Sequence, residues 1–275
     1  MRSSRFLAAA FLGTSSIVAF PAYAVAPLIA HRAVYDLALD KASDRSGITG
    51  VQGRMVYEFN GSPCEGYTVN FRFVTRIDTE GNSRLTDQQT TTFEDGSGKT
   101  FSFVTKSFTD QALERELKGM AQLETNGLRV EIDKPEKNTL ELRKTQFPTQ
   151  HLVELIDKAN TGQKFYETNL FDGSENGDKV MTTTVVVGKK SATEVTDPEL
   201  PALDKLAKDQ YWPVEIAYFD DKGKGGEEVP EYRIAFKLHE NGLTRDLVMD
   251  YGDFSMTGKL VNLSVFDKQP QQSCK

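Results

Sequence analysis

Residues 55–73, MVYEFNGSPCEGYTVNFRF, decide the fold. Large apolar side chains occupy every second position on either side of an Asn-Gly pair: Met55, Tyr57 and Phe59, then Tyr67, Val69, Phe71 and Phe73. Alternation with a period of two is typical of β-strands that bury one face, and Asn60-Gly61 is a hairpin turn signal. The stretch therefore predicts an antiparallel hairpin that turns at Asn60-Gly61.

The same pattern continues in both directions along the chain. Ala33, Tyr35 and Leu37 alternate with polar residues upstream, and further turn signals follow at Gly81-Asn82, Asp95-Gly96, Asn126-Gly127 and Asn241-Gly242. The last predicted strand runs from Phe254 to Phe266. No repeat of fixed period occurs, which excludes a propeller or solenoid. We expect a mainly β protein of long antiparallel strands.

The period changes to that of a helix once. Leu152, Leu155, Ile156 and Ala159 are spaced as one apolar helix face after Phe147-Pro148, and Gly162 is a stop signal. We predict one short amphipathic helix at about residues 149–159 that packs on the sheet. Leu200, Leu203 and Leu206 indicate a shorter helical turn, and residues 220–228 form a charged glycine loop that we expect to be mobile.

Composition excludes several classes of protein. The 275 residues are 38% hydrophobic and 27% charged, which is typical of a folded chain. Acidic residues outnumber lysine and arginine by 40 to 33, which argues against nucleic acid as the main partner. Beyond the N-terminal segment no stretch approaches the roughly 20 apolar residues of a transmembrane helix.

The first 24 residues have the features of a signal peptide. Arg2 and Arg5 precede an apolar segment, and Ala22-Tyr23-Ala24 is a cleavage pattern. We predict cleavage after Ala24, which leaves an exported protein of residues 25–275 with no integral membrane segment.

Two cysteines remain in this exported chain, Cys64 and Cys274. An even count in an oxidising compartment indicates a disulfide, and two cysteines so far apart form neither a redox nor a zinc motif. The bridge would enclose nearly the whole mature chain. It therefore favours a single domain over residues 25–275.

Three local patterns suggest a nucleotide, metal or catalytic site. Gly96-Ser97-Gly98-Lys99-Thr100 resembles the end of a phosphate-binding loop, but Phe93 stands where the first glycine is required, and the residues after Thr100 alternate as a strand. We predict a hairpin turn there and no bound nucleotide.

Residues 172–177, DGSENG, resemble the start of a calcium loop, but Thr183 replaces the carboxylate at the twelfth position. We expect a solvated turn before a strand at Val180–Val187, without a metal. The histidines His31, His151 and His239 have no ligand or catalytic spacing, and we expect His151 at the surface or at a helix end, within reach of Glu154. The sequence thus predicts no cofactor and no catalytic residue.

Six segments together resemble the cell-envelope integrity protein B family of alphaproteobacteria. They are His31–Asp36, Cys64–Tyr67, Phe147–His151, Phe171–Ser174, Trp212–Val214 and the C-terminal Cys274. The resemblance covers the mature chain. It implies a periplasmic β-spiral, a broken barrel-like bowl clasped by a disulfide that corresponds to Cys64 and Cys274, and a role in envelope integrity and stress resistance.

Two hypotheses about function follow. The first is a non-catalytic periplasmic protein that binds an envelope component, such as a lipid, a lipoprotein or a peptidoglycan-associated protein. The alternative is a hydrolase that acts on an envelope polymer through a pair of carboxylates about 5 to 10 Å apart. An apolar concave surface without titratable groups favours the first, and a carboxylate pair in a cleft favours the second.

The disulfide is directly testable. Reduction should add the mass of two hydrogens, and Cys64→Ser should lower the melting temperature without loss of the fold, because the bridge restricts mainly the unfolded chain. Free thiols in protein purified from the periplasm would show that the bridge is absent.

Overall fold

The computed structural model describes residues 28–220 and 229–266. The predicted signal peptide, Cys274 and residues 221–228 of the predicted glycine loop lie outside these ranges. The disulfide therefore stays a prediction, and its partner Cys64 is exposed in the turn between two strands.

The described strands form one antiparallel sheet of 14 strands in the order β8-β7-β6-β5-β4-β3-β2-β1-β14-β13-β12-β11-β10-β9. The strands of the first half are β1 His31–Ala42, β2 Ile48–Ser62, β3 Gly66–Thr79, β4 Asn82–Glu94, β5 Thr100–Thr109, β6 Ala112–Leu123, β7 Leu128–Lys134 and β8 Asn138–Leu142. Those of the second half are β9 Phe165–Leu170, β10 Met181–Val187, β11 Tyr211–Asp220, β12 Tyr232–His239, β13 Thr244–Asp250 and β14 Phe254–Val265.

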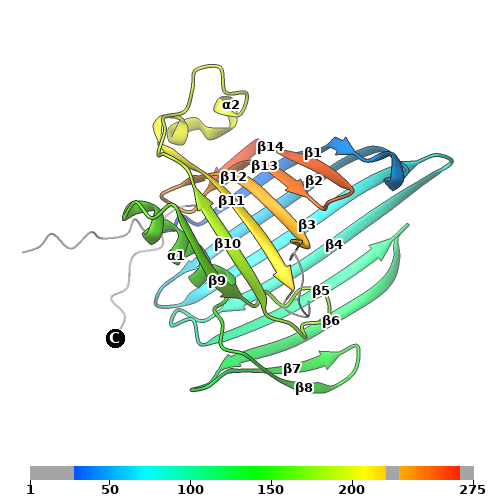
Figure 1. The fold of residues 1–275 in the computed structure, drawn as a ribbon, viewed down its shortest axis with the longest axis vertical. Coiled ribbons are helices and arrows are strands. Elements are labelled where there is room, and N and C mark those ends of the chain that lie inside the picture. Colours follow the sequence, from blue (N-terminus) through cyan, green and yellow to red (C-terminus); the bar gives the residue numbers. More distant parts are fainter. Residues whose placement is uncertain (1–27, 221–228, 267–275) are drawn as a thin grey trace, which may run out of the picture.

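Strand β1 pairs with both β2 and β14 and so joins two meanders into one sheet, which curls into a bowl (Figure 1). In Figure 1, β9–β13 cross in front of β3–β6, so the two halves of the sheet face one another. The sequence prediction of a mainly β, broken barrel-like fold is confirmed.

The main core fills the space between these halves. Alternate residues of β1 point into this core. Ala33 and Tyr35 are 0% and 1% exposed, whereas Arg32, which precedes Ala33 on the strand, is exposed. Trp212 and Phe236 on the opposite wall are 3% and 9% exposed. Period two in the sequence thus separates an inner from an outer face along each strand.

The bowl does not close by strand pairing, because β8 and β9 are the two edges of the sheet. A second apolar cluster closes the gap, in which Phe147, Phe171 and Val180 pack on the inner side chains of β5–β7. The rings of Phe101 and Phe147 stack with centroids 5.2 Å apart. Side-chain packing, together with one parallel bridge between Gln146 and Leu170, therefore takes the place of a full backbone ladder.

Helix α1, Pro148–Asn160, confirms the predicted helix and extends it by one residue at each end. Its N-cap residue Phe147 has no side chain that could accept a hydrogen bond. Glu94 at the end of β4 supplies the acceptors instead, since its carboxylate accepts the backbone N–H of Thr149 at 2.7 Å and of Gln150 at 3.1 Å. This contact fixes the helix start inside one end of the bowl.

The predicted turn at Asn60-Gly61 is wrong by a few residues. Both residues belong to β2, which continues to Ser62, and the chain turns at Pro63–Glu65. Pro63 has no N–H to donate to the ladder, which stops the pairing there. The other four turn signals lie between consecutive strands as predicted.

The predicted helical turn near Leu200 is also confirmed. Helix α2, Leu200–Leu203, is followed by a 3-10 turn at Asp204–Lys208, and Leu203 is 1% exposed. No helix within the described ranges is long and apolar enough to cross a bilayer.

A buried ion network attaches the segment before α2 to the sheet. Arg245 of β13 is fully buried and donates from Nη1 to Asp197 at 2.8 Å and to Glu199 at 2.9 Å. Glu199 also accepts the backbone N–H groups of Asp246 and Leu260 at 3.0 and 2.7 Å. Each buried charge is therefore matched by opposite charge or by hydrogen bonds.

Breaking this network should destabilise the protein strongly. Arg245→Met removes the cation that pairs with the buried Glu199 and leaves Asp197 with Lys237 alone, and we expect a loss of about 3 to 5 kcal/mol in the free energy of unfolding. The comparison is Arg129→Met, whose exposed pair with Glu131 should contribute little to stability, because solvent screens it. Urea unfolding measures both, and equal effects would contradict the assigned role of Arg245.

Candidate functional site

The string that resembles a phosphate-binding loop forms the turn between β4 and β5, as predicted. The carboxylate of Asp95 accepts the backbone N–H groups of Ser97 and Lys99 at 3.1 and 2.6 Å, together with that of Thr100. These are the amides that a phosphate would need. A phosphate at this turn would therefore meet a carboxylate in place of free N–H groups.

The segment that resembles a calcium loop connects β9 with β10, and its oxygens contact protein groups. Asp172 accepts the N–H of Ser174 at 2.8 Å, and Asn176 Oδ1 accepts a hydrogen bond of 2.7 Å from Arg115. Glu175 forms an ion pair with Lys179 at 3.0 Å. In the described ranges no group of three or more histidine, cysteine or acidic side chains is placed to hold a metal ion.

His151 is buried, so the prediction of a surface position is wrong, although the residue does lie in the first turn of α1. It is 5% exposed, and its Nε2 lies 3.2 Å from the hydroxyl of Thr183 on β10. Burial lowers its pKa to about 4. The helix pattern located the residue, but only the curl of the sheet around α1 turned this helix face inward.

His239 is fully buried as well. Its Nε2 accepts a hydrogen bond of 2.9 Å from Arg245, and burial together with this positive charge lowers its pKa to about 4. The imidazole is therefore a neutral acceptor inside the ion network near neutral pH.

The buried carboxylates have structural partners. Asp197 and Glu199 share the guanidinium of Arg245, with side chains only 4% and 2% exposed. Glu94 is 2% exposed and caps α1. These groups stabilise the fold and are closed off from substrate.

Six uncharged side chains on the concave face are only partly covered by the two cores, and we call them the inner strip. They are Phe71 and Phe73 of β3, Gln88 and Thr90 of β4, and Thr105 and Ser107 of β5. Cross-strand register aligns them in two rows, Phe71-Thr90-Thr105 and Phe73-Gln88-Ser107. The second row continues through Met55 to the buried Tyr35, which places the strip on the inner face.

The inner strip combines aromatic and hydroxyl groups. The rings of Phe71 and Phe73 stack with centroids 5.9 Å apart, and the hydroxyls of Thr90 and Thr105 hydrogen bond at 3.0 Å. The hydroxyls of Thr90 and Thr105 satisfy one another, so the strip combines the apolar contact of two rings with a paired set of hydroxyls.

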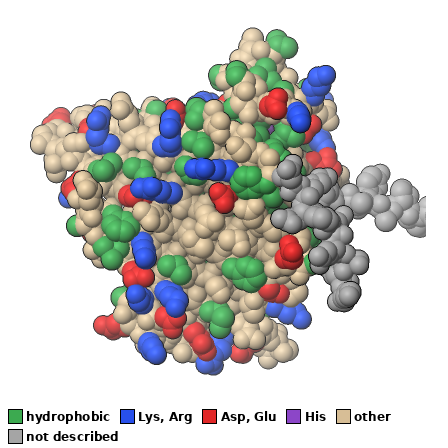
Figure 2. Space-filling model, turned by 180° about the vertical axis from the view of Figure 1, so that it is seen from behind, with side chains coloured by type: hydrophobic (Ala, Val, Ile, Leu, Met, Phe, Trp, Pro, Cys, Tyr) green, Lys and Arg blue, Asp and Glu red, His purple; other side chains and the backbone are tan. Residues whose placement is uncertain are grey.

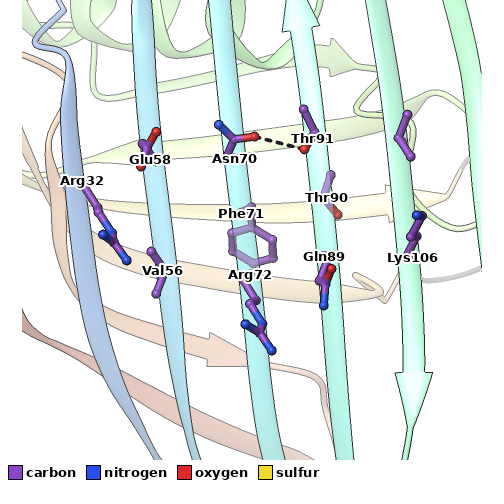
Figure 3. Close-up of a pocket in the computed structure, with 11 residues that line it drawn as sticks. Arg32, Val56, Glu58, Asn70, Phe71, Arg72, Gln89, Thr90, Thr91 and Lys106 are labelled. Carbon is purple, nitrogen blue, oxygen red and sulfur yellow. Dashed lines mark hydrogen bonds between the residues drawn. The ribbon is translucent and has the colours of Figure 1, made fainter. Parts of the chain in front are cut away.

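The opposite face of the same strands holds a shallow hollow of about 500 Å³, the outer hollow (Figure 3). Its charged lining residues are Arg32 of β1, Glu58 of β2, Arg72 of β3 and Lys106 of β5. Asn70, Gln89 and Thr91 lie between them, and Thr91 donates to Asn70 at 3.0 Å.

The sequence analysis singled out neither surface as a site. Each contains one or two residues from each of several strands, so no local motif exists. The alternation around Phe71 and Arg72 assigned these residues to opposite faces, but cross-strand register was needed to assemble each surface.

Comparisons with known proteins agree with this architecture. A family model described as EipB-like matches residues 22–267. A protein of Brucella abortus (strain 2308) named cell envelope integrity protein EipB is 58% identical over 263 residues, which cover 95% of this chain and 91% of that protein. The crystal structure of a beta-barrel-like protein of unknown function from Brucella abortus is 59% identical, with a TM-score of 0.85 over 88% of this chain and 100% of that chain.

The buried histidines predict a loss of stability in acid. The folded pKa of His151 is about 4 and its ordinary value is 6.5, so the unfolded state binds the proton first as the pH falls. Stability is therefore unaffected above about pH 6.5 and should fall by about 3 kcal/mol by pH 4 on account of this residue.

Urea unfolding at neutral pH and at pH 4 measures the effect, with His151→Gln as the comparison. Glutamine does not titrate, so the variant should lose less stability than the wild type over this interval. An identical pH dependence in both proteins would contradict the low pKa of His151.

Proposed function

Because the chain belongs to the EipB-like family, we propose that it maintains cell-envelope integrity from the periplasm by binding an apolar envelope component, without catalysis. The relative from Brucella abortus is named a cell envelope integrity protein, which supports the envelope role. The signal peptide predicted over residues 1–24 and the predicted bridge between Cys64 and Cys274 are consistent with an oxidising, exported location.

The inner strip is the observation that carries the proposal. Phe71 and Phe73 lie on the concave face of the sheet and are only partly covered. Apolar side chains that a core leaves uncovered favour a ligand that removes them from water, at about 25 cal/mol for each Å² buried. An acyl chain of a lipid or lipoprotein is the component that fits such an uncharged surface.

The chemistry of the strip supports binding over hydrolysis. Its six residues include no carboxylate, histidine, lysine or cysteine, so no member of the strip titrates near neutral pH. The hydroxyls of Thr90 and Thr105 bond to each other and have no neighbouring base among the strip residues. A bound acyl chain would therefore be held and left unchanged.

Two adjacent glutamines provide a matched test of this site. Gln88 faces the concave side and Gln89 the outer hollow, and both are exposed. Gln88→Trp should fill the inner strip and weaken binding of a fluorescent fatty acid by about tenfold or more, a difference of about 1.4 kcal/mol. Gln89→Trp should leave this affinity unchanged, because its side chain lies on the other face.

Fluorescence titration gives the two affinities, and circular dichroism checks both folds. Unchanged fatty-acid binding by Gln88→Trp, or equal weakening by both variants, would contradict binding at the inner strip. In cells that lack the gene, Gln88→Trp at normal abundance should fail to restore detergent resistance. Full loss of complementation by Glu154→Gln or Asp172→Asn at normal abundance would instead indicate chemistry and favour the hydrolase alternative.

A further inference from the structure

The outer hollow has three cationic side chains on alternate strands. Arg32 lies on β1, Arg72 on β3 and Lys106 on β5. Adjacent strands are about 4.8 Å apart, so the three strands that carry these cations span roughly 19 Å across the sheet. Figure 3 shows Arg32, Arg72 and Lys106 in sequence across the strands.

These cations differ in how the protein neutralises them. Arg72 forms a bidentate pair with Asp87 at 2.8 and 3.1 Å and keeps a side-chain exposure of 59%. Arg32 stands opposite Glu58 and Lys106 opposite Glu116 in the strand register, but neither cation forms an ion pair within the described ranges, and Glu116 pairs with Lys134 instead. Two cations at the ends of the hollow are therefore available to an external anion.

The surface between the cations carries both polar groups and the apolar residues Val56, Phe71 and Val104. Asn70, Gln89 and Thr91 provide amide and hydroxyl groups, and Glu58 is the one carboxylate among the lining residues. All these residues stand on paired strands, so little conformational entropy is lost when a ligand binds. Figure 2 shows this side of the molecule with an uncharged central area around which basic and acidic side chains are interspersed.

We propose that the outer hollow binds a linear polyanion that crosses β1–β5 and contacts Arg32, Arg72 and Lys106 with successive carboxylate or phosphate groups. Charge complementarity identifies this ligand class, because Arg32, Arg72 and Lys106 line one hollow of a chain that is otherwise acidic, with 40 Asp and Glu against 33 Lys and Arg. A polyanion is repelled by most of such a protein, so its binding depends on the local cations. Phe71 and Thr90 of the inner strip also line the hollow, but the three cations that carry this proposal do not belong to the strip.

Titration with a linear polyphosphate and with poly-L-glutamate tests the proposal and separates phosphate from carboxylate recognition. The wild-type protein should bind at least one of them, and raising the salt concentration should weaken binding. Arg32→Gln combined with Lys106→Gln should weaken it by about tenfold or more, since two charge-assisted contacts are lost. Gln89→Trp should also weaken it by filling the hollow.

The control removes the same charge elsewhere on the outer face. Arg54 pairs with Asp36 and Lys118 with Asp133, and neither lines the hollow, so the double variant Arg54→Gln, Lys118→Gln should bind within about twofold of the wild type. Equal weakening by the two double variants, or no binding of either polymer by the wild type, would overturn the proposal. Gln88→Trp should leave polymer binding intact, so failure of the inner-strip proposal is recognised separately.

Discussion

The pairing of β1 with β14 is the interaction on which the whole architecture depends. The ladder runs from His31 opposite Val265 to Ala42 opposite Phe254 and joins the two ends of the described chain. Without it the protein would consist of two separate meanders, each with an uncovered apolar face. Strands so distant in sequence pair only after a large loss of chain entropy. The apolar contacts buried in the two cores must offset this loss.

The curled sheet has two edges on the side opposite β1 and β14, and these edges must be covered. The edges β8 and β9 do not pair, and an open edge exposes backbone groups and apolar surface. Phe147 and Phe171 cover the inner side of β5–β7, while Arg143 donates to the Val180 carbonyl and to Thr182 across the gap. Closure by side chains leaves the bowl less regular than a barrel and provides the space in which α1 sits.

Both proposed binding surfaces follow from one property of β-strands. Successive residues of β3–β5 point to opposite faces, so Gln88 belongs to the concave strip and Gln89 to the outer hollow. The inner face is uncharged and aromatic there, and the outer face is cationic and polar. A single curved wall can therefore present an apolar surface and a charged surface to two different envelope components.

The sequence by itself determined the strands, α1 and four of the five named turns, because period two, period 3.6 and glycine at turns depend on neighbouring residues alone. It missed the turn at Pro63–Glu65 by a few residues, since Asn60-Gly61 carries the stronger local signal. It also placed His151 in the first turn of α1 but not in the interior. Which residues meet across strands was decided only by tertiary structure. Arg245 pairs with Asp197 and Glu199, and Glu94 accepts hydrogen bonds from the start of α1. Arg72 aligns with Lys106 across β4. Strand register and the curl of the sheet bring these distant segments together, and neither is encoded in a local pattern.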